Sequence, residues 1–332
     1  MSMSRTLQAQ HDRFPLIRPF RIARGTKTAA DVVTVTIGEG SAIGRGEAVP
    51  YPRYGETIEG ALAAIDEVRP MIEQGGGRAA LLDALPAGAA RNAIDCALWD
   101  LEARLSRRDV AAMIGGPALR PVASAMTVVI DTPGAMARAA MLEEAPLLKI
   151  KVDANDPEAQ IRAVRAAAPG AELIVDPNES WDRALLDRMQ PVLVETRVAL
   201  IEQPVPAGSD DWLEGFTPAV PICADESVHV AADLEVVARR YQAVNVKLDK
   251  AGGLTAALAL AKAARARGLG LMTGCMVSSS LSIAPALHLA MMSDFVDLDG
   301  PVWLLEDRPG GIGMDGGFIH PPEAGFWGSS RT

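Results

Sequence analysis

Short apolar runs recur along the chain from about residue 147, and each ends in a polar side chain. The first run, 147–152, carries Lys149 and Lys151 on one face of a strand, while Ile150 and Val152 point to the opposite face. The later runs end at Asp176, Glu202, Asp225, Lys247, Cys275 and Asp297. From Lys151 onward, successive ends lie 22 to 28 residues apart, which suits one strand, one helix and two loops. This pattern predicts a (β/α) barrel whose polar strand ends share one rim.

The chain before this repeat shows a different pattern. Three β-rich stretches separated by glycine turns precede two stretches of helical periodicity, which predicts a small α+β domain. These strands and helices are predicted at 20–23, 32–37, 45–49, 56–74 and 88–105. Barrel strands are predicted from 125–130 to 295–298, with helices at 133–144, 156–168 and 280–292. The fold class is therefore α/β, with an α+β capping domain (1–120), a barrel (121–300) and a Gly/Pro-rich segment (301–332) that returns to the cap.

Composition narrows the choice of partners and location. The chain has 332 residues, more than the roughly 250 of a bare barrel, and its 49% hydrophobic content supports a large core. A net charge of −10 disfavours nucleic acid and anionic membranes as partners. No apolar run approaches the roughly 20 residues of a membrane span, and the polar N-terminus lacks the apolar core of a signal peptide. Three distant cysteines indicate reduced thiols, so we expect a cytoplasmic protein.

Three carboxylates end three consecutive predicted strands, at Asp176, Glu202 and Asp225. Side by side at one rim they would repel one another and raise each other's pKa unless a cation lay among them. Oxygen ligands without histidine or cysteine favour Mg²⁺, with Mn²⁺ as the alternative, over zinc. The competing interpretation is that each carboxylate caps the next helix or pairs with a lysine at the rim. Three carboxylates in register beside two lysines favour the metal site.

The lysines predict the reaction. Lys151 and Lys247 belong to strands on opposite sides of the barrel, so a substrate between them would meet an amine on each face. A nearby divalent ion and Lys149 would lower the pKa of the lysine that acts as a base. One lysine would then remove a proton α to a carboxylate, the metal would stabilise the enediolate, and the other lysine would return the proton from the far side. Alternatively, Lys149 and Lys247 form salt bridges at the rim.

These residues stand in motifs that resemble those of the enolase superfamily, in its muconate-lactonizing subgroup. The motifs are Lys149-Ile150-Lys151, Asp176-Pro177-Asn178, Ile201-Glu202-Gln203-Pro204, Ala224-Asp225-Glu226-Ser227 and Val246-Lys247-Leu248-Asp249-Lys250-Ala251-Gly252-Gly253. The resemblance runs from about Phe20 to Leu304 and implies a modified (β/α)₇β TIM barrel with an α+β capping domain. It also implies Mg²⁺ on the three carboxylates and Lys151 and Lys247 as the acid/base catalysts.

Within the subgroup the chain looks most like dipeptide epimerases that interconvert L-Ala-D-Glu and L-Ala-L-Glu in murein peptide metabolism. Asp297 and Asp299 share one face of the last strand, which suits a substrate ammonium, and the resemblance gives them this role. It implies that Arg24 reads the distal glutamate carboxylate, against the alternative of a solvated loop charge. Further substrate contacts implied by the resemblance are Thr127, Lys149, Cys275 and Met276. Family members often assemble, so a homo-oligomer stays open.

Other sequence signals carry little weight. Residues 311–316 fit G-x-G-x-x-G but lack a strand–helix context, so we do not expect dinucleotide binding. Cys275 ends a strand, yet no histidine stands at a neighbouring strand end to activate it. The same absence argues against the acid-sugar dehydratase branch.

Four alternative functions stay open at this point. Two share the scaffold: an epimerase of other dipeptides, and an o-succinylbenzoate synthase or cycloisomerase. The two acids Asp297 and Asp299 disfavour an anionic substrate without an ammonium group. The others are a Schiff-base aldolase that uses Lys247 and a non-catalytic binding module, which would bind without exchanging the α-proton.

Overall fold

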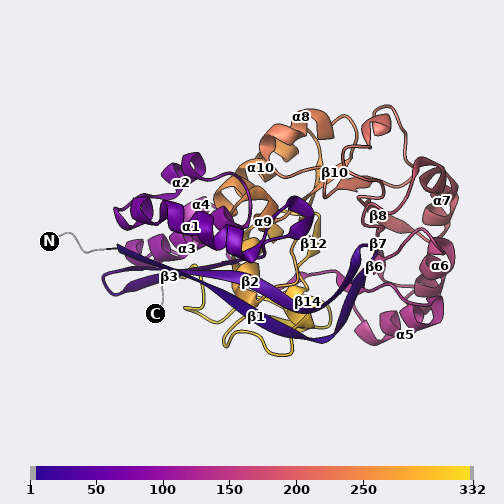
Figure 1. The fold of residues 1–332 in the computed structure, drawn as a ribbon. Helices are drawn as coiled ribbons and strands as arrows, with labels where there is room; N and C mark the ends of the chain where they lie inside the picture. The colour runs from indigo at the N-terminus through magenta and orange to yellow at the C-terminus, as the bar shows by residue number, and fades with distance from the viewer. Residues whose placement is uncertain (1–4, 330–332) are drawn as a thin grey trace.

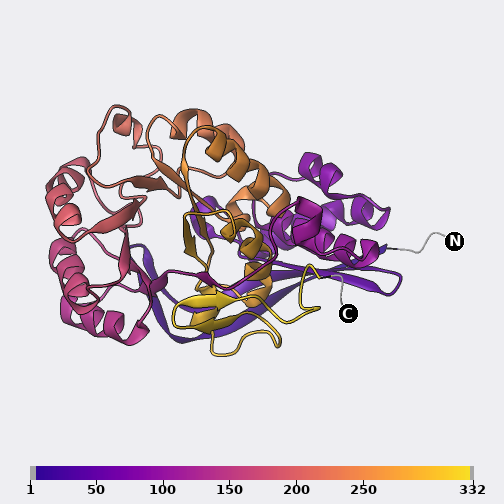
Figure 2. The same cartoon turned by 180° about the vertical axis from the view of Figure 1, so that it is seen from behind.

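A computed structural model describes residues 5–329, and the chain forms two main parts (Figure 1). A three-stranded antiparallel sheet with its helices forms the N-terminal cap, and an eight-stranded parallel sheet with surrounding helices forms the barrel. Seen from behind, the C-terminal segment, in yellow, runs beside the long N-terminal strands (Figure 2). Within 5–329, no helix combines the length and apolar character needed to cross a membrane.

The cap sheet is an antiparallel meander of β1 (Arg5–Ile22), β2 (Gly25–Glu39) and β3 (Ala42–Ala48). The predicted meander is confirmed, but β1 is far longer than the predicted 20–23. Its positions alternate between partly buried and exposed over a largely polar sequence, so it lacks the apolar run that identifies a strand. The register of β1 on β2 shifts between Pro15 and Phe20. Beyond this shift the hairpin continues to a tip that reaches the barrel (Figure 1).

Helices cover one face of the cap sheet. The helical segments are η1 (Pro52–Tyr54), α1 (Ile58–Glu73), α2 (Arg78–Ala84), α3 (Ala89–Ser106) and α4 (Val110–Ile114). The two longest confirm the predicted helices, whereas α2 and α4 have 7 and 5 residues, too few to show a helical period in the sequence. Apolar residues of β2 meet those of α1 and α3 in one core, which includes Val33, Val35, Ile37, Ile65, Ile94 and Leu98.

Glycine is required where β3 lies against α3. A Cβ built on Gly46 would stand 2.1 Å from the backbone oxygen of Ala93 and 2.7 Å from the amide nitrogen of Ala97. Neither backbone group can move without separating the strand from the helix. Replacing Gly46 by alanine is therefore expected to reduce the free energy of unfolding by roughly 3 kcal/mol, measured by urea denaturation.

Gly170 provides the matched control for this substitution. A Cβ built on Gly170 meets no atom within 4 Å, and the residue does not need a positive φ. Gly170→Ala should therefore leave the unfolding midpoint unchanged. Equal midpoints for the two variants would contradict the close approach of β3 to α3.

The barrel sheet follows the predicted order of eight parallel strands. Strands β5 to β12 are Met126–Val128, Leu147–Lys151, Glu172–Asp176, Val198–Glu202, Ile222–Ala224, Ala243–Val246, Gly270–Gly274 and Phe295–Asp297. The amide of Ala125, just before β5, donates to the oxygen of Val296 on β12 at 2.7 Å, so the first and last strands meet. The sheet therefore closes, as in a TIM barrel.

Helices surround the barrel. They are α5 (Pro133–Glu143), α6 (Pro157–Ala167), α7 (Arg183–Glu195), α8 (Leu234–Val237), α9 (Leu248–Ala251), α10 (Leu254–Ala266) and α11 (Ser280–Ala290). Between β8 and β9 only the 3₁₀ turn η2 (Asp211–Leu213) stands where a regular repeat predicts a helix, and the 3₁₀ turn η3 (Ala231–Asp233) precedes α8. The barrel is therefore a modified one, as predicted.

One apolar layer fills the barrel interior below the rim. It consists of Ala125, Leu147, Ile174, Leu200, Cys223, Ala243 and Met272, one from each strand or its start, with Phe295 packed beside them. Residues on the opposite face of β6, such as Leu148 and Ile150, pack into the outer core with the helices. Because strand side chains alternate, the next inward position on each strand lies two residues later, above this layer.

The C-terminal segment returns to the cap after the 3₁₀ turn η4 (Gly300–Trp303). Strand β13 (Gly313–Asp315) pairs with β14 (Phe318–His320), and β14 pairs with β4 (Val122–Ala123). The guanidinium of Arg308 bonds Glu47 on β3 at 2.8 Å. Residues 311–316 run into this hairpin rather than into a strand–helix turn, so the G-x-G-x-x-G match is not a dinucleotide loop.

Candidate active site

A ring of polar side chains lies directly above the apolar layer of the barrel. Each stands two residues after a layer residue of its own strand: Thr127, Lys149, Asp176, Glu202, Asp225, Asn245 and Asp297. All are buried. The strand period therefore brings together the predicted carboxylates and lysine from five separate strands, which is the arrangement that the sequence pattern predicted.

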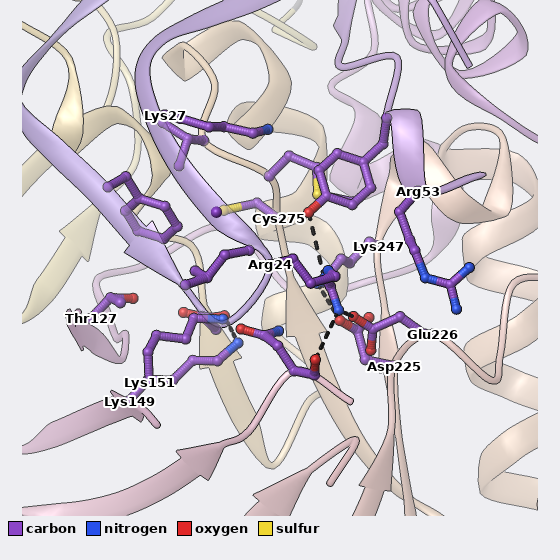
Figure 3. Close-up of a pocket in the computed structure, with 18 of the residues that line it drawn as sticks. Arg24, Lys27, Arg53, Thr127, Lys149, Lys151, Asp225, Glu226, Lys247 and Cys275 are labelled. Carbon is purple, nitrogen blue, oxygen red and sulfur yellow. Dashed lines mark hydrogen bonds and ion pairs between the residues drawn. The ribbon is translucent and has the colours of Figure 1, made fainter. Parts of the chain in front are cut away.

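Four residues of this ring, Thr127, Lys149, Asp225 and Asp297, line a cavity of about 470 Å³ between the barrel and the cap (Figure 3). The hairpin of β1 and β2 and the residues around η1 contribute its cap side, including Phe20, Ile22, Lys27, Tyr51 and Tyr54. All of the proposed substrate-contact residues, including Thr127, Cys275 and Met276, also line it. The cavity has the size of a small-molecule site.

Lys149 lies at the centre of the acidic ring. Its Nζ is 2.6 Å from Oε2 of Glu202, 2.7 Å from Oδ2 of Asp297 and 3.1 Å from Oδ2 of Asp176. Burial lowers the pKa of the lysine, but these three carboxylates outweigh burial and hold it well above its usual range. Lys149 is therefore a buried cation that offsets part of the negative charge of the ring, rather than a solvated residue at the rim.

The two predicted catalytic lysines enter the cavity from different sides (Figure 3). Nζ of Lys151, at the end of β6, lies 2.5 Å from Oδ2 of Asp176. Nζ of Lys247, just after β10, lies 2.6 Å from Oδ2 of Asp225. Burial lowers the pKa of Lys247, but Asp225 and Glu202 outweigh it and raise the pKa well above the usual value. The expected lowering of this pKa therefore depends on a cation that engages the carboxylates.

Two further buried residues, to which the sequence argument gave no role, support the ring. Nζ of Lys250 lies 2.6 Å from Oδ1 of Asp225 and also donates to the backbone oxygen of Asn245 at 3.0 Å. The side-chain amide of Asn245 donates to Oε1 of Glu202 at 2.8 Å. Lys250 stands three residues after Lys247 in the same motif, and Asn245 is the inward position of β10. Strand alternation could have identified Asn245.

Within 5–329, no three carboxylate, histidine or cysteine side chains already enclose a metal position, because ammonium groups lie between the acids. The donor set nevertheless fits a hard cation, since Asp176, Glu202 and Asp225 offer only oxygen from adjacent strands. Oε2 of Glu202 is buried, and its contact is the ion pair with Lys149, which lacks hydrogen-bond geometry. Burial raises the pKa of Glu202 to about 7, against the lowering effect of Lys149 and with a further rise from Asp176 and Asp225. Additional positive charge would therefore stabilise this carboxylate.

The acids at the end of β12 differ in their partners. Oδ2 of Asp299 accepts the amide of Thr127 at 2.9 Å and the indole NH of Trp303 at 3.2 Å. Burial and the neighbouring Asp297 raise the pKa of Asp299 to about 6. Oδ1 of Asp297 is buried without a hydrogen-bond partner, although its Oδ2 meets Lys149. Asp297 therefore keeps one free acceptor beside the cavity.

Arg24 occupies the tip of the β1–β2 hairpin and bonds the barrel rim. Its Nη1 lies 2.7 Å from Oε1 of Glu226 and 3.1 Å from Oε2 of Glu179, and it donates to the backbone oxygen of Asn178 at 3.2 Å. Arg53 also pairs with Glu179, at 2.8 Å. The side chain of Arg24 is thus not a solvated loop charge. Neither rim glutamate was predicted, because pairing across the two domains leaves no mark in the sequence.

Comparison with known proteins assigns the family. Residues 134–325 match the family described as "Enolase C-terminal domain-like". Residues 4–115 match "Mandelate racemase / muconate lactonizing enzyme, N-terminal domain". Together these matches cover most of the barrel and most of the cap.

Individual relatives are similar over nearly their whole length. The chain is 46% identical to the L-Ala-D/L-Glu epimerase of Escherichia coli (strain K12), covering 95% of this chain and 99% of the relative. It is 42% identical to the N-acetyl-D-glutamate racemase of a Pseudoalteromonas species, covering 91% of this chain and 96% of that one.

Solved structures show the same relationship. An enolase family member from Agrobacterium tumefaciens, with bound sodium, L-Ala-L-Glu and an ordered loop, has a TM-score of 0.95 at 46% identity and covers 98% of this chain and all (100%) of its own. A dipeptide epimerase from Enterococcus faecalis V583 in complex with Mg and L-Leu-L-Tyr has a TM-score of 0.90 at 27% identity and covers 99% of each chain. The chain therefore belongs to the enolase superfamily, in its mandelate racemase and muconate-lactonizing enzyme group.

Proposed function

We propose that this protein is a Mg²⁺-dependent dipeptide epimerase that interconverts L-Ala-D-Glu and L-Ala-L-Glu, dipeptides that arise in murein peptide metabolism. The observation that carries the proposal is the pair Lys151 and Lys247, which enter one cavity from different sides above a ring of buried carboxylates. The names and ligands of the relatives support the same reaction class.

The two lysines would perform the proton transfers. One amine would remove the proton from the α-carbon of the C-terminal residue, and the ammonium opposite would deliver a proton to the other face. The same pair serves the reverse reaction with the roles exchanged. Proton delivery from the face opposite to removal inverts the configuration of the α-carbon, so both lysines are needed for each turnover.

Asp176, Glu202 and Asp225 would hold the Mg²⁺ ion. When bound there, the ion would supply positive charge to the substrate carboxylate and so make the adjacent α-proton more acidic. Lys149 would hold two of these ligands and Asp297 in place, because its Nζ contacts Asp176, Glu202 and Asp297 together.

Asp297 supports a substrate with a free ammonium. Its Oδ1 is buried at the cavity without a hydrogen-bond partner, and Asp299 lies on the same side two residues later. An α-ammonium between them would satisfy the free acceptor and reduce the repulsion that raises the pKa of Asp299. This arrangement favours a dipeptide over an N-acylated amino acid.

The proposed function is tested by proton exchange. Incubation of a dipeptide panel with the protein and Mg²⁺ in D₂O should place deuterium at the α-carbon of the C-terminal residue, with inversion. L-Ala-L-Glu is expected to react fastest, and NMR and chiral chromatography measure both events. Binding of dipeptides without α-deuteration would contradict the proposal and indicate a non-catalytic binding module.

A second candidate is racemisation of N-acetylglutamate, favoured by the 42% identity to the Pseudoalteromonas enzyme. This substrate has the same side-chain and α-carboxylates but no ammonium, so it would leave the free acceptor of Asp297 unsatisfied. N-acetyl-D-glutamate belongs in the D₂O panel. Faster exchange with N-acetylglutamate than with L-Ala-L-Glu would favour this candidate.

Replacing Asp297 by asparagine should distinguish the two substrates. Loss of the carboxylate charge is expected to lower kcat/KM for L-Ala-L-Glu by roughly 100-fold, because a charged hydrogen bond to the ammonium is lost. Turnover of N-acetylglutamate should fall much less. Asp294→Asn is the matched control, since Asp294 pairs with Arg265 on the surface near the start of β12. Unchanged dipeptide turnover in Asp297→Asn would contradict the ammonium site.

A further inference from the structure

The cap side of the cavity carries a cation that the proposed function has not yet used. Lys27 lies near the start of β2, directly opposite Phe20 of β1 in the hairpin register, and Ile22 lies opposite Gly25. Directly paired residues share a face of the sheet, and all four line the cavity. The register therefore turns Lys27 toward the substrate space, where it is half-buried (Figure 3).

Lys27 has no anionic partner among residues 5–329. Its Nζ lies 4.7 Å from the centre of the Tyr51 ring, a cation–π contact, and it forms no hydrogen bond or ion pair within that range. Every other lysine of the cavity is paired, since Lys149, Lys151 and Lys247 each contact a carboxylate within 2.7 Å. Lys27 is thus the cavity lysine whose charge is still free to meet an anion.

Arg24, the residue first expected to read the distal carboxylate, is already committed. It pairs with Glu226 and Glu179, whose side chains are 1% and 8% exposed. Moving Arg24 to a substrate would leave the buried Glu226 without its cation, which is costly. Glu179 lies in the loop after β7 and Glu226 in the loop after β9, so these ion pairs make Arg24 an anchor that holds the hairpin over the cavity.

We infer that Lys27 is the specificity-determining residue that binds the side-chain carboxylate of the substrate's C-terminal residue, while Arg24 positions the hairpin that carries it. This inference rests on the proposed dipeptide epimerase function and names the basis of its preference for an acidic residue. The ring of Tyr51 holds the ammonium of Lys27 in place through the cation–π contact. Phe20, paired with Lys27 across the hairpin, contributes an apolar wall to the same part of the cavity.

The test compares L-Ala-L-Glu with L-Ala-L-Gln, which has the same shape but no side-chain charge. Lys27→Met is expected to lower kcat/KM for L-Ala-L-Glu by roughly 30- to 100-fold, mainly through KM, since the contact is remote from the α-carbon. Turnover of L-Ala-L-Gln should change less than about threefold, because the uncharged glutamine side chain forms no ion pair with Lys27 and a solvated contact to its amide contributes little binding energy. Lys27→Arg should restore the preference for glutamate.

Two further variants keep the test decisive. Arg24→Met should lower turnover of both dipeptides alike, because it frees the hairpin from the barrel rim but leaves Lys27, which would bind the substrate carboxylate, in the chain. Lys27→Glu should accept L-Ala-L-Lys better than the wild type does, which provides a gain of activity that misfolding cannot produce.

The outcomes separate the inference from the function it rests on. An unchanged ratio of L-Ala-L-Glu to L-Ala-L-Gln turnover in Lys27→Met, with active wild type, would overturn the role of Lys27 alone. A ratio that collapses in Arg24→Met but not in Lys27→Met would return the role to Arg24. Absence of α-proton exchange with either dipeptide in the wild type would instead overturn the proposed function.

Discussion

Replacing Lys151 or Lys247 by alanine is expected to reduce epimerisation of L-Ala-D/L-Glu by roughly 10⁴-fold in both directions. Both side chains are buried at the cavity, and a water molecule in the place of either amine would be a far weaker base. Each turnover needs one amine to remove the proton and one ammonium to return it, so neither lysine can act alone. The rate is measured by chiral chromatography of the dipeptides.

The same variants should separate the two half-reactions. If each lysine serves one face of the α-carbon, each variant should still exchange the α-proton of one epimer with D₂O and lose exchange with the other. The two variants should lose opposite epimers. Lys262→Ala is the control, since Lys262 lies exposed on α10 and should exchange both. Loss of exchange with the same epimer in both variants would contradict the opposed arrangement.

Removal of divalent ions is expected to abolish activity, and added Mg²⁺ should restore it. The carboxylates of Asp176, Glu202 and Asp225 would otherwise present their charge to the substrate carboxylate and repel it. Glu202→Gln should lower kcat on the order of 10³-fold, because it replaces one carboxylate oxygen by an amide nitrogen and removes the negative charge of the ligand. Activity is measured after EDTA treatment and after titration with Mg²⁺ or Mn²⁺.

A surface substitution and a trapping experiment complete this prediction. Glu195→Gln changes an exposed carboxylate that pairs with Arg162 and should leave the Mg²⁺ requirement unchanged. Borohydride with substrate should not increase the mass of the chain, whereas a Schiff-base aldolase that uses Lys247 would be trapped. Full activity in EDTA together with a trapped adduct would establish that alternative.

Much of the site could be predicted from the sequence because strand geometry is local. On seven of the eight barrel strands, the inward residue of the apolar layer is followed two positions later by a polar residue, as with Leu147 and Lys149 or Ile174 and Asp176. Alternation fixes which side chains share a face, and the parallel order of the strands places their ends at one rim. Recurrence alone therefore indicated which acids lie together.

Contacts between distant segments could not be predicted in the same way. Two such contacts are the pairing of Arg24 with Glu226 and the insertion of Lys149 among three carboxylates rather than at the rim. Both depend on how the hairpin and the strands are placed in three dimensions. The long β1 escaped prediction because its polar positions hide the period of two. The position of Lys27 follows from the hairpin register beyond the shift at Pro15, which no pattern in the sequence encodes.

The most direct test is a crystal structure with Mg²⁺ and L-Ala-L-Glu bound. We expect the ion on Asp176, Glu202 and Asp225, with the amines of Lys151 and Lys247 on opposite faces of the glutamate α-carbon. Both amines on one face, or no ion among the three acids, would contradict the central claim.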